Sequence, residues 1–293
     1  MKKSKWKIQI SPLAIILFIC LLAYSITLIV PLLWALMTSF KLQTDFRINV
    51  LGFPNPIAWN YTFVFQQFKV PVTLETGIVE ITMGKMYVYT ILYSLGCAFF
   101  NTLVPCVTAY LCARFDKKLS KIIYMTNIVT MILPIVGALP AELQMAKTFG
   151  LFDQIWGLWI MKANFLGTYF LVFYAGFKEL SLTYTEAAKI DGANNFFILI
   201  KIILPLVRNI FFTVMLVNFI AFWNDYQVPL MYMPSYPTLA YGMYILANTK
   251  ENGLSTVPMR MTGAMLLFLP ILAVFIIFQN RLLGNLTMGG IKG

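Results

Sequence analysis

Residues able to do chemistry are scarce in this sequence, and their scarcity narrows its function. The chain has no histidine, which removes the side chain most used as a general base and metal ligand near neutral pH. The four cysteines, Cys20, Cys97, Cys106 and Cys112, lie singly inside apolar runs without CxxC spacing. They are typical of small buried apolar side chains rather than of ligands or disulfides. We therefore expect neither a metal site nor a catalytic site in this chain.

The most informative local pattern is the segment 181–206, SLTYTEAAKIDGANNFFILIKIILPL. Thr183 and Glu186 have the spacing of a capping box, in which each side chain bonds the backbone of the other. Thr185 is an equally good candidate for the cap. The pattern predicts a short helix that runs through Glu186 to Ile190.

The second half of this segment contains residues that end one helix and begin another. Gly192 suits the left-handed conformation that commonly ends a helix. Asn194 or Asn195 can cap a second helix, which Pro205 should interrupt where the next apolar stretch begins. The segment is therefore expected to form two short helices joined by a tight turn. Long apolar stretches of the kind that cross a membrane lie on both sides of it, so the two helices would project from the membrane.

The composition of this helical turn allows two interpretations. Small side chains permit close approach to another surface, and three charged side chains provide polar contacts; the residues are Ala187, Ala188 and Ala193, with Glu186, Lys189 and Asp191. The shape suits docking into a groove of a partner protein. An amphipathic helix lying in the lipid interface is the alternative, and the residues alone leave the two about equally favoured.

The composition of the whole chain places it in a membrane. Of its 293 residues 60% are hydrophobic and 11% are charged, with a mean hydropathy of +0.78. Soluble domains carry roughly 25% charged residues, so an ordinary soluble protein, a disordered protein and a secreted disulfide scaffold are excluded. The net charge of +11 is spread between apolar stretches, as on cytoplasmic loops of membrane proteins. It does not indicate nucleic-acid binding.

Six apolar segments are candidates for membrane-spanning helices, because about 20 helical residues cross a hydrocarbon core of ~30 Å. The fourth is interrupted by Lys162 and the fifth by Asp225. The first is too long for the core of a cleaved signal peptide, so we expect it to be retained. The segments are 8–40, 86–113, 122–141, 154–177, 209–230 and 261–280.

The distribution of basic residues predicts the orientation of these spans. With the N-terminus inside, the inside segments hold 14 of the 22 lysines and arginines, and the outside segments with their flanks hold the other 8. An excess inside is the rule for membrane proteins. We therefore expect one transmembrane domain over residues 1–293. It would have a long outside loop at 41–85, an inside loop at 178–208 and an inside tail at 284–293.

The inside loop resembles a known family motif. The string from Glu186 to Ala193, EAAKIDGA, followed by Leu204-Pro205-Leu206, resembles the EAA loop of ABC-importer permeases. The whole chain is similar to the carbohydrate-uptake permeases, of the kind represented by the second membrane subunit of the maltose transporter. Further agreements lie at 31–41, 101–102, 109–115, 222–226 and 284–293.

The chain departs from this family at two places. Relatives often carry a second proline shortly after Leu-Pro-Leu, where this sequence has Arg208 and Asn209. The loop 43–85 matches nothing in the family. The second departure leaves open what the outer face contacts.

The resemblance implies a fold, a function and a set of partners. The fold would be all-α, a polytopic MetI-like permease fold with about six transmembrane helices in the plasma membrane of a prokaryote. The chain would form half of the pathway of an ATP-driven importer for a sugar or oligosaccharide. Its partners would be a second permease subunit, which the family suggests is a different chain, two cytosolic ATPase subunits and an extracellular solute-binding protein.

The resemblance also implies which residues act. Those that would couple to the ATPases are Glu186, Ala187, Ala188, Asp191, Gly192, Ala193, Leu204 and Pro205. The sequence contains no GxxxxGK[ST] motif, so ATP and magnesium are expected on the partner ATPase chains. We expect no cofactor on this chain and no enzyme activity of its own.

A polar and aromatic stripe in the fifth span provides candidates for solute contact. Asn218, Phe222 and Asp225 are spaced i, i+4 and i+7, which places them on one helical face. A charged group in the hydrocarbon region costs roughly 2.5–3.5 kcal/mol on insertion scales, so it usually faces a cavity or a partner. Sugars bind polar groups and aromatic faces, and this stripe offers both. The alternative is that Asp225 lies at a helix end in a structural salt bridge.

Two other functions are alternatives to sugar import. A permease of the same superfamily could carry a polyamine, phosphate or a peptide, although a polyamine would require several carboxylates and Asp225 is the one clear candidate. A membrane-embedded enzyme is disfavoured, because the chain lacks histidine, an HExxH motif and clustered intramembrane carboxylates.

Overall fold

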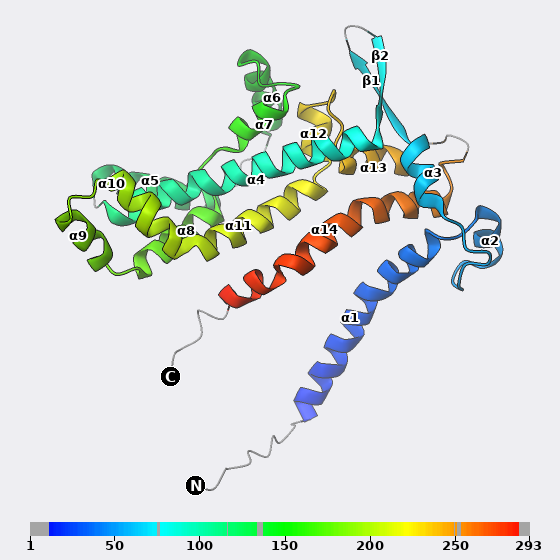
Figure 1. Ribbon diagram of the computed structural model, residues 1–293, viewed down its shortest axis with the longest axis horizontal. Helices are drawn as coiled ribbons and strands as arrows, with labels where there is room; N and C mark the ends of the chain where they lie inside the picture. Colours follow the sequence, from blue (N-terminus) through cyan, green and yellow to red (C-terminus); the bar gives the residue numbers. More distant parts are fainter. Residues whose placement is uncertain are drawn as a thin grey trace. The chain divides into compact units, whose positions relative to one another are not determined.

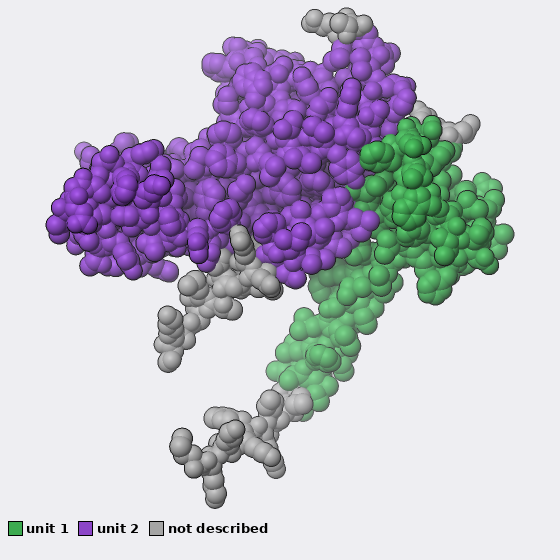
Figure 2. Space-filling model, in the orientation of Figure 1, with its two compact units in different colours: residues 1–67, 246–266 green, residues 68–245, 267–293 purple. Residues whose placement is uncertain are grey.

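The computed structural model describes residues 12–74, 77–115, 117–133, 137–248, 250 and 253–286, with side chains up to residue 279. The basic N-terminal stretch and residues 287–293 of the tail lie outside this range, so what was expected of them stays a prediction. The chain forms two compact units (Figure 2), residues 1–67 with 246–266 and residues 68–245 with 267–293.

In the first unit, side-chain hydrogen bonds hold the backbone just after the C-terminal end of the long apolar helix α1. The elements of this unit include α1 Pro12–Thr38, α2 Gln43–Ile48 and α3 Asn60–Gln67. The Asn60 side-chain amide donates to the carbonyls of Ser39 and Lys41, both at 2.8 Å. The Thr262 hydroxyl donates to the same Ser39 carbonyl at 3.1 Å. These donors satisfy carbonyls that a helix end leaves without backbone partners.

Lys41 is fully buried in this unit, although from the sequence alone it counted only as a charge of the outside loop. Its ammonium group donates to the carbonyls of Asn49 and Val50, just beyond the end of α2. A cation is favoured there because the last carbonyls of a helix carry partial negative charge. The string Thr38–Lys41, which resembles that of relatives, thus orders the chain that follows α1.

The second unit is built around α4, Met83–Arg114, which runs along most of its length (Figure 1). Three helices pack along α4: α7 Ile155–Lys162, α8 Thr168–Glu179 and α11 Leu204–Asn224. The remaining helices of the chain are α5 Lys118–Ile132, α6 Leu139–Thr148, α9 Thr183–Ile190, α10 Asn195–Phe197, α12 Gln227–Tyr232, α13 Leu239–Asn248 and α14 Val257–Leu286.

The chain is mostly helical, as predicted, but one hairpin precedes α4. Strand β1, Lys69–Leu74, pairs antiparallel with β2, Gly77–Thr82. Val70, Val72 and Ile81 are buried on one face of this hairpin, which reflects the alternation of side chains along a strand. The alternating β-branched residues of this stretch could have predicted the two strands from the sequence.

Four of the six expected spans coincide with long apolar helices in the part of the chain that the structure describes: 12–38, 83–114, 195–224 and 257–279. The other two are corrected. Segment 122–141 is divided between α5 and α6, and segment 154–177 between α7 and α8. With 15 residues in α5 and 12 in α8, neither helix alone crosses a core of ~30 Å.

A buried asparagine satisfies the backbone where α7 and α8 are separated. The Asn127 carbonyl oxygen accepts from the Gly167 N–H at 2.7 Å, and its amide donates to the Gly167 carbonyl at 3.4 Å. Gly167 has φ +118, a conformation that favours glycine. Non-helical backbone at membrane depth is tolerated where protein groups satisfy it, and Asn127, which is fully buried, does so here.

The cysteines are free, and three of them confirm the expectation of burial. Cys97, Cys106 and Cys112 are buried, whereas Cys20 is exposed on α1. The expectation was wrong for Cys20 because the apolar side chains of α1 are exposed along most of its length.

Two glycines on α4 allow a matched test of this packing. A Cβ at Gly96 would collide with the indole of Trp159, whose N–H donates to the Leu92 carbonyl at 3.0 Å; a Cβ at Gly84 would meet nothing within 4 Å. Gly96→Ala is therefore expected to lower the thermal unfolding temperature of the purified protein in detergent. Gly84→Ala should leave it unchanged or raise it, because alanine favours a helix by about 1 kcal/mol over glycine. Equal effects of the two substitutions would contradict the α4–α7 packing.

Candidate functional site

The predicted inside loop forms a helical projection at one end of the second unit. α9 and α10 lie beyond the end of α8 and the start of α11 (Figure 1). The base of this projection is held by Arg114, the last residue of α4, whose guanidinium donates to the Leu180 carbonyl at 3.0 Å. The loop is thus attached to the central helix of the unit.

The predicted first helix is present, but its predicted cap is wrong. α9 begins at Thr183 after Leu182, whose side chain makes no capping bond. The Thr183 hydroxyl lies 2.7 Å from the Ser181 hydroxyl, which also accepts the Thr183 N–H at 3.2 Å. Because Thr183 is bonded to Ser181, it does not form the expected capping box with Glu186. The Thr185 hydroxyl has no partner in the described structure and does not cap either.

The predicted turn after α9 is confirmed. Gly192 has φ +80, the left-handed conformation expected for a helix end. Its N–H donates to the Lys189 carbonyl at 3.0 Å, and the Ala193 N–H donates to the Ala188 carbonyl at 2.9 Å. This pair of bonds is the Schellman arrangement, which satisfies carbonyls at the end of the helix.

The second helix begins as predicted but does not stop at Pro205. Asn194 caps it by accepting the Phe197 N–H at 2.8 Å. The chain then continues through a π-helical segment, Ile198–Ile203, directly into α11. Pro205 has no N–H to bond the carbonyl four residues earlier, and the wider turns of the π segment accommodate it. The prediction of a second short helix was therefore wrong.

The predicted coupling residues divide into an exposed group and an anchoring group. Glu186, Ala187, Asp191, Gly192 and Pro205 are exposed. Ala188 is buried, and Ala193 and Leu204 are half-buried against the core formed by α4, α8 and α11. The first group is available for contact with another protein, and the second group fixes the position of the turn.

Two exposed apolar side chains at this turn were missed by sequence reasoning. Ile190 is 86% exposed and Phe196 is 72% exposed. They flank Gly192 and Asn194. Apolar residues so close to a predicted helix end could have been recognised from the sequence as exposed. Their exposed apolar surface on this projection is available for contact with protein or membrane.

Eight of the fourteen basic residues predicted for the inside lie on or beside the helix ends near α9. They lie where α4 ends, α5 begins, α8 ends and α11 begins (Figure 1). The set is Arg114, Lys117, Lys118, Lys121, Lys178, Lys189, Lys201 and Arg208. The orientation was predicted from the count of these same residues, so the cytoplasmic location of this end stays a prediction.

The candidate solute-contact residue Asn218 faces α4. It is 3% exposed, and its amide donates to the Thr102 hydroxyl at 3.0 Å. The Asn101 amide donates to the Asn218 oxygen at 3.1 Å. From the sequence alone, Asn101 and Thr102 had no structural role. Asn218 is therefore part of the packing of α11 on α4 in this conformation.

Helix α11 ends at Asn224, so Asp225, the next residue, lies just beyond the helix rather than within a span. It accepts from the Tyr93 hydroxyl at 2.9 Å and from the N–H groups of Gln227 and Val228. These hydrogen bonds, and not the salt bridge considered as the alternative, stabilise it. Phe222 packs edge-on against Tyr93 with ring centroids 5.8 Å apart. The three candidates therefore all meet α4, and their contact with solute stays a prediction.

A second hydrogen bond between a phenol and a carboxylate joins α12 to α6. The Tyr232 hydroxyl of α12 donates to the Glu142 carboxylate of α6 at 2.9 Å. Burial, and then this bond to Glu142, raises the pKa of Tyr232 to about 12. The phenol therefore stays protonated and remains a donor throughout the physiological pH range.

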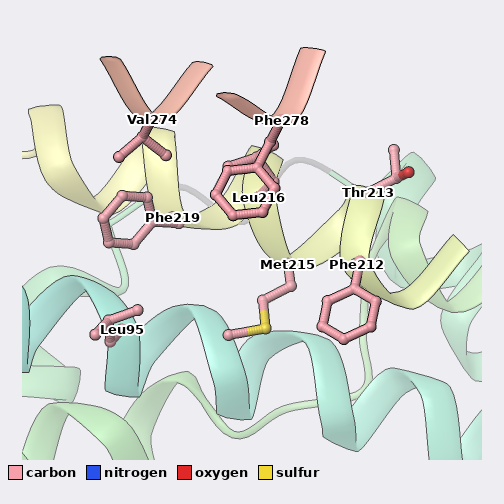
Figure 3. Close-up of a pocket in the computed structure, with 8 residues that line it drawn as sticks. All are labelled: Leu95, Phe212, Thr213, Met215, Leu216, Phe219, Val274 and Phe278. Atoms are coloured by element: carbon pink, nitrogen blue, oxygen red, sulfur yellow. The ribbon is translucent and has the colours of Figure 1, made fainter. Parts of the chain in front are cut away.

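An apolar pocket lies between α4, α11 and α14 (Figure 3). Phe212, Met215 and Phe219 of α11 line it, with Val274 of α14 opposite. Thr213 is its polar residue, and neither Asn218 nor Asp225 lines it. Such a surface suits hydrocarbon or an apolar helix rather than a solute rich in hydroxyl groups.

Comparison with known proteins identifies the family. Residues 106–286 match the model of the family described as binding-protein-dependent transport system inner membrane component. The chain belongs to this family. The permease is therefore a multi-pass membrane transport subunit of an ABC importer, located in the cell membrane.

Several curated relatives match this permease over nearly its full length. It is 24% identical to the diacetylchitobiose uptake system permease protein of Streptomyces coelicolor, over 92% of this chain and 86% of the relative. It is 27% identical to the multiple sugar-binding transport system permease protein of Streptococcus mutans, over 94% and 96%. It is 26% identical to the maltodextrin transport system permease protein of Streptococcus pneumoniae, over 94% of each.

A solved structure shares the fold. The permease superposes with a TM-score of 0.73 on a chain of a bacterial ABC transporter involved in the import of the acidic polysaccharide alginate. The match covers 91% of this chain and 95% of that chain, at 20% sequence identity. It supports the predicted MetI-like permease fold.

Replacing Asn218 tests its structural role. Asn218→Leu leaves the Thr102 and Asn101 side chains without their partner, and an unsatisfied buried polar group costs about 1–3 kcal/mol. We expect a lower thermal unfolding midpoint in detergent. The control is Asn224→Leu on the same helix, because Asn224 is exposed and bonds the Ile220 carbonyl of its own helix. A larger loss of stability in the control would contradict the buried network.

Proposed function

We propose that this permease forms half of the translocation pathway for a sugar or oligosaccharide and is driven by separate ATPase subunits. The observation that carries the coupling role is the helix–turn of α9 and Gly192, which projects at the basic end of the unit with Glu186, Ala187 and Asp191 exposed. A projection of this kind suits the groove of a cytosolic partner.

Three kinds of partner would complete the importer. A second permease subunit, encoded as a different chain, would form the other half of the pathway. Two cytosolic ATPase subunits would bind ATP and magnesium and would each grip one helical turn like that of α9. A solute-binding protein would deliver the sugar at the outer face. The permease itself would have no cofactor and no catalytic site.

The sugar class rests on the names of the relatives. The diacetylchitobiose, multiple-sugar and maltodextrin permeases each match more than nine-tenths of this chain. A polyamine pathway would require free carboxylates to pair with the cations. Asp225 is already engaged by Tyr93 and by two backbone N–H groups, which does not favour that alternative.

The coupling mechanism follows from the attachment of α9 at both ends. On one side, Arg114 joins the start of the loop to α4. On the other, the helix that begins at Asn195 continues without a break to Asn224. Closure of the ATPase pair would move the turn at Gly192, and this motion would reach both α4 and α11. Asn218, Phe222 and Asp225 lie between these two helices, where such a motion would open a path to the solute.

The chain offers a matched pair of glycines for testing the coupling role. Gly150 ends α6 with φ +66 and forms the same Schellman bonds as Gly192, from its own N–H to Lys147 and from Leu151 to Ala146. A Cβ added at either glycine would meet nothing within 4 Å. A valine at either position therefore imposes the same left-handed strain, at least about 1 kcal/mol.

Gly192→Val is expected to abolish most solute-stimulated ATP hydrolysis and uptake by the complete importer in proteoliposomes. Gly150→Val should destabilise the protein to the same extent but leave transport per folded complex near normal. The contribution of stability is removed by measuring both activities per correctly assembled complex. Equal losses of transport in the two variants would count against docking by α9.

A charge reversal tests the same surface without strain. Glu186→Lys changes an exposed side chain of α9, and Glu179→Lys changes an exposed side chain at the end of α8. We expect the first variant to release the ATPase subunits during purification and the second to retain them. If both variants retained ATPase and transported normally, Glu186 would have no coupling role.

The solute class is tested by uptake. Proteoliposomes that contain the importer and its binding protein should accumulate labelled oligosaccharide upon addition of ATP. They should not accumulate labelled putrescine or phosphate. Uptake of either of these without uptake of any sugar would replace the sugar assignment but would leave the coupling role intact.

A further inference from the structure

An apolar loop joins α2 to α3 in the first unit. From Ile48 to Phe68 the sequence has no charged residue. Large apolar side chains of this stretch are more than half exposed, among them Leu51 at 78% and Phe53 at 83%. The others are Ile48, Ile57 and Trp59. We call residues 49–59 the α2–α3 loop. Its exposed apolar surface is available for contact with lipid or with protein.

Two contacts place this loop beside the last turn of α1 (Figure 1). The Trp34 indole N–H donates to the Val50 carbonyl at 3.0 Å. The same indole packs against Phe46 of α2, with ring centroids 6.2 Å apart. Trp34 lies about one turn before α1 ends at Thr38, and helical side chains tilt toward the start of their helix. The Val50 carbonyl is therefore level with the last turn of α1.

The depth of this last turn in a membrane follows from the length of α1. The helix has 27 residues, so it is about 40 Å long at 1.5 Å per residue. A bilayer with its polar interfacial layers is roughly 40–45 Å thick. Because α1 is long and apolar enough to cross it, and is exposed along most of its length, both ends of the helix reach the interfacial layers. The α2–α3 loop, beside the last turn, is therefore at interfacial depth.

Polar backbone groups of the loop form hydrogen bonds within the unit. The buried Lys41 ammonium donates to the carbonyls of Asn49 and Val50. The Asn49 side chain closes the next turn, because its oxygen accepts the Gly52 N–H at 2.7 Å and its amide donates to the Phe53 carbonyl at 3.0 Å. Backbone groups that are bonded in this way can enter an apolar medium at low cost. The turn thus presents its apolar side chains outward without leaving these carbonyls unpaired.

The few charges and the aromatic residues around the loop also suit an interfacial position. Asp45 is half-buried, and its carboxylate accepts the Asn55 N–H at 3.1 Å. Arg47 is exposed in the last turn of α2, where a long cationic side chain can reach the polar head groups. Trp59 packs against Tyr61 with ring centroids 5.1 Å apart. Tryptophan and tyrosine are enriched where a membrane meets water.

We propose that the α2–α3 loop is seated in the interfacial layer of the membrane, with Leu51 and Phe53 inserted between the lipids. Lipid is favoured over a protein partner because the loop is fixed beside the last turn of a spanning helix. An exposed apolar face binds at this boundary through the apolar area that it buries. The loop would hold the end of α1 at a set depth. The proposal requires only that α1 crosses the membrane, and it rests neither on the solute nor on the coupling turn at Gly192.

Fluorescent probes that report their surroundings test this proposal. The complete importer is reconstituted in lipid nanodiscs, with partner subunits that carry no cysteine and with Cys20→Ala in this chain. The other three cysteines are buried and are kept. The dye NBD is attached to Leu51→Cys, Phe53→Cys or Ile78→Cys, one position at a time. Quenching is then measured with aqueous iodide and with lipids that carry a nitroxide.

Ile78 provides the matched control. It is an aliphatic side chain that is 74% exposed, against 78% for Leu51. It lies on β2 of the hairpin, where Lys69 and Glu80 form an exposed ion pair at 2.6 Å. Because an exposed ion pair of this kind is typical of a surface in water, a probe at Ile78 is expected to be quenched by iodide and not by lipid.

The opposite result is expected at both Leu51 and Phe53. Lipids with the nitroxide at the level of the head group should quench these two probes, and should do so more strongly than lipids with the nitroxide at the end of the acyl chain. Iodide should quench them much less than it quenches the probe at Ile78. This pattern would place the loop in the interfacial layer.

Two outcomes would overturn the proposal. Iodide quenching at Leu51 and Phe53 as strong as at Ile78 would place the loop in water. Protection of both probes from iodide and from lipid would show that a protein covers them, and would assign the loop to an interface with a partner subunit. Neither outcome bears on the sugar class or on coupling through α9, so failure of this proposal is distinguishable from failure of the proposed function.

Discussion

The structure of this permease depends on satisfying backbone hydrogen bonds in a medium without water. A continuous helix does so by itself, and α4 is the example around which the second unit is assembled. Where a span is broken, side chains must supply the missing partners. Asn127 supplies both for Gly167, between α7 and α8. Asn60 and Thr262 do the same for the Ser39 carbonyl beyond α1. These few polar side chains satisfy the backbone beside helix ends.

The same constraint explains which parts of the fold could be predicted from the sequence. Long uncharged runs predicted α1, α4, α11 and α14, because length and hydropathy suffice for a continuous span. They did not predict that 122–141 and 154–177 would be divided, since the partner of the break at Gly167 is Asn127, which is distant in sequence. The hairpin β1–β2 was missed because its signal, alternating β-branched residues in two strands of six, is shorter and weaker than that of an apolar span. Lys41 was counted as a loop charge because its burial depends on carbonyls of Asn49 and Val50 that only the fold brings near.

For the candidate site, two local signals were reliable, others failed, and long-range contacts could not be predicted. The turn at Gly192 and the cap at Asn194 follow from the preferences of single residues, and both were predicted. The cap at Thr183 failed because Ser181, two residues away, binds the same hydroxyl. The stripe of Asn218, Phe222 and Asp225 could be placed on one face, but its partners Tyr93, Asn101 and Thr102 lie on another helix. Helical spacing carries no information about what that face meets.

The continuity of α10 with α11 has a mechanical consequence. Asn195–Asn224 is one helical rod of 30 residues, about 45 Å long at 1.5 Å per residue. The π segment Ile198–Ile203 gives this rod a section of wider turns close to its Asn195 end. A displacement of its Asn195 end would therefore reach its Asn224 end as a tilt, with no loop between them to bend.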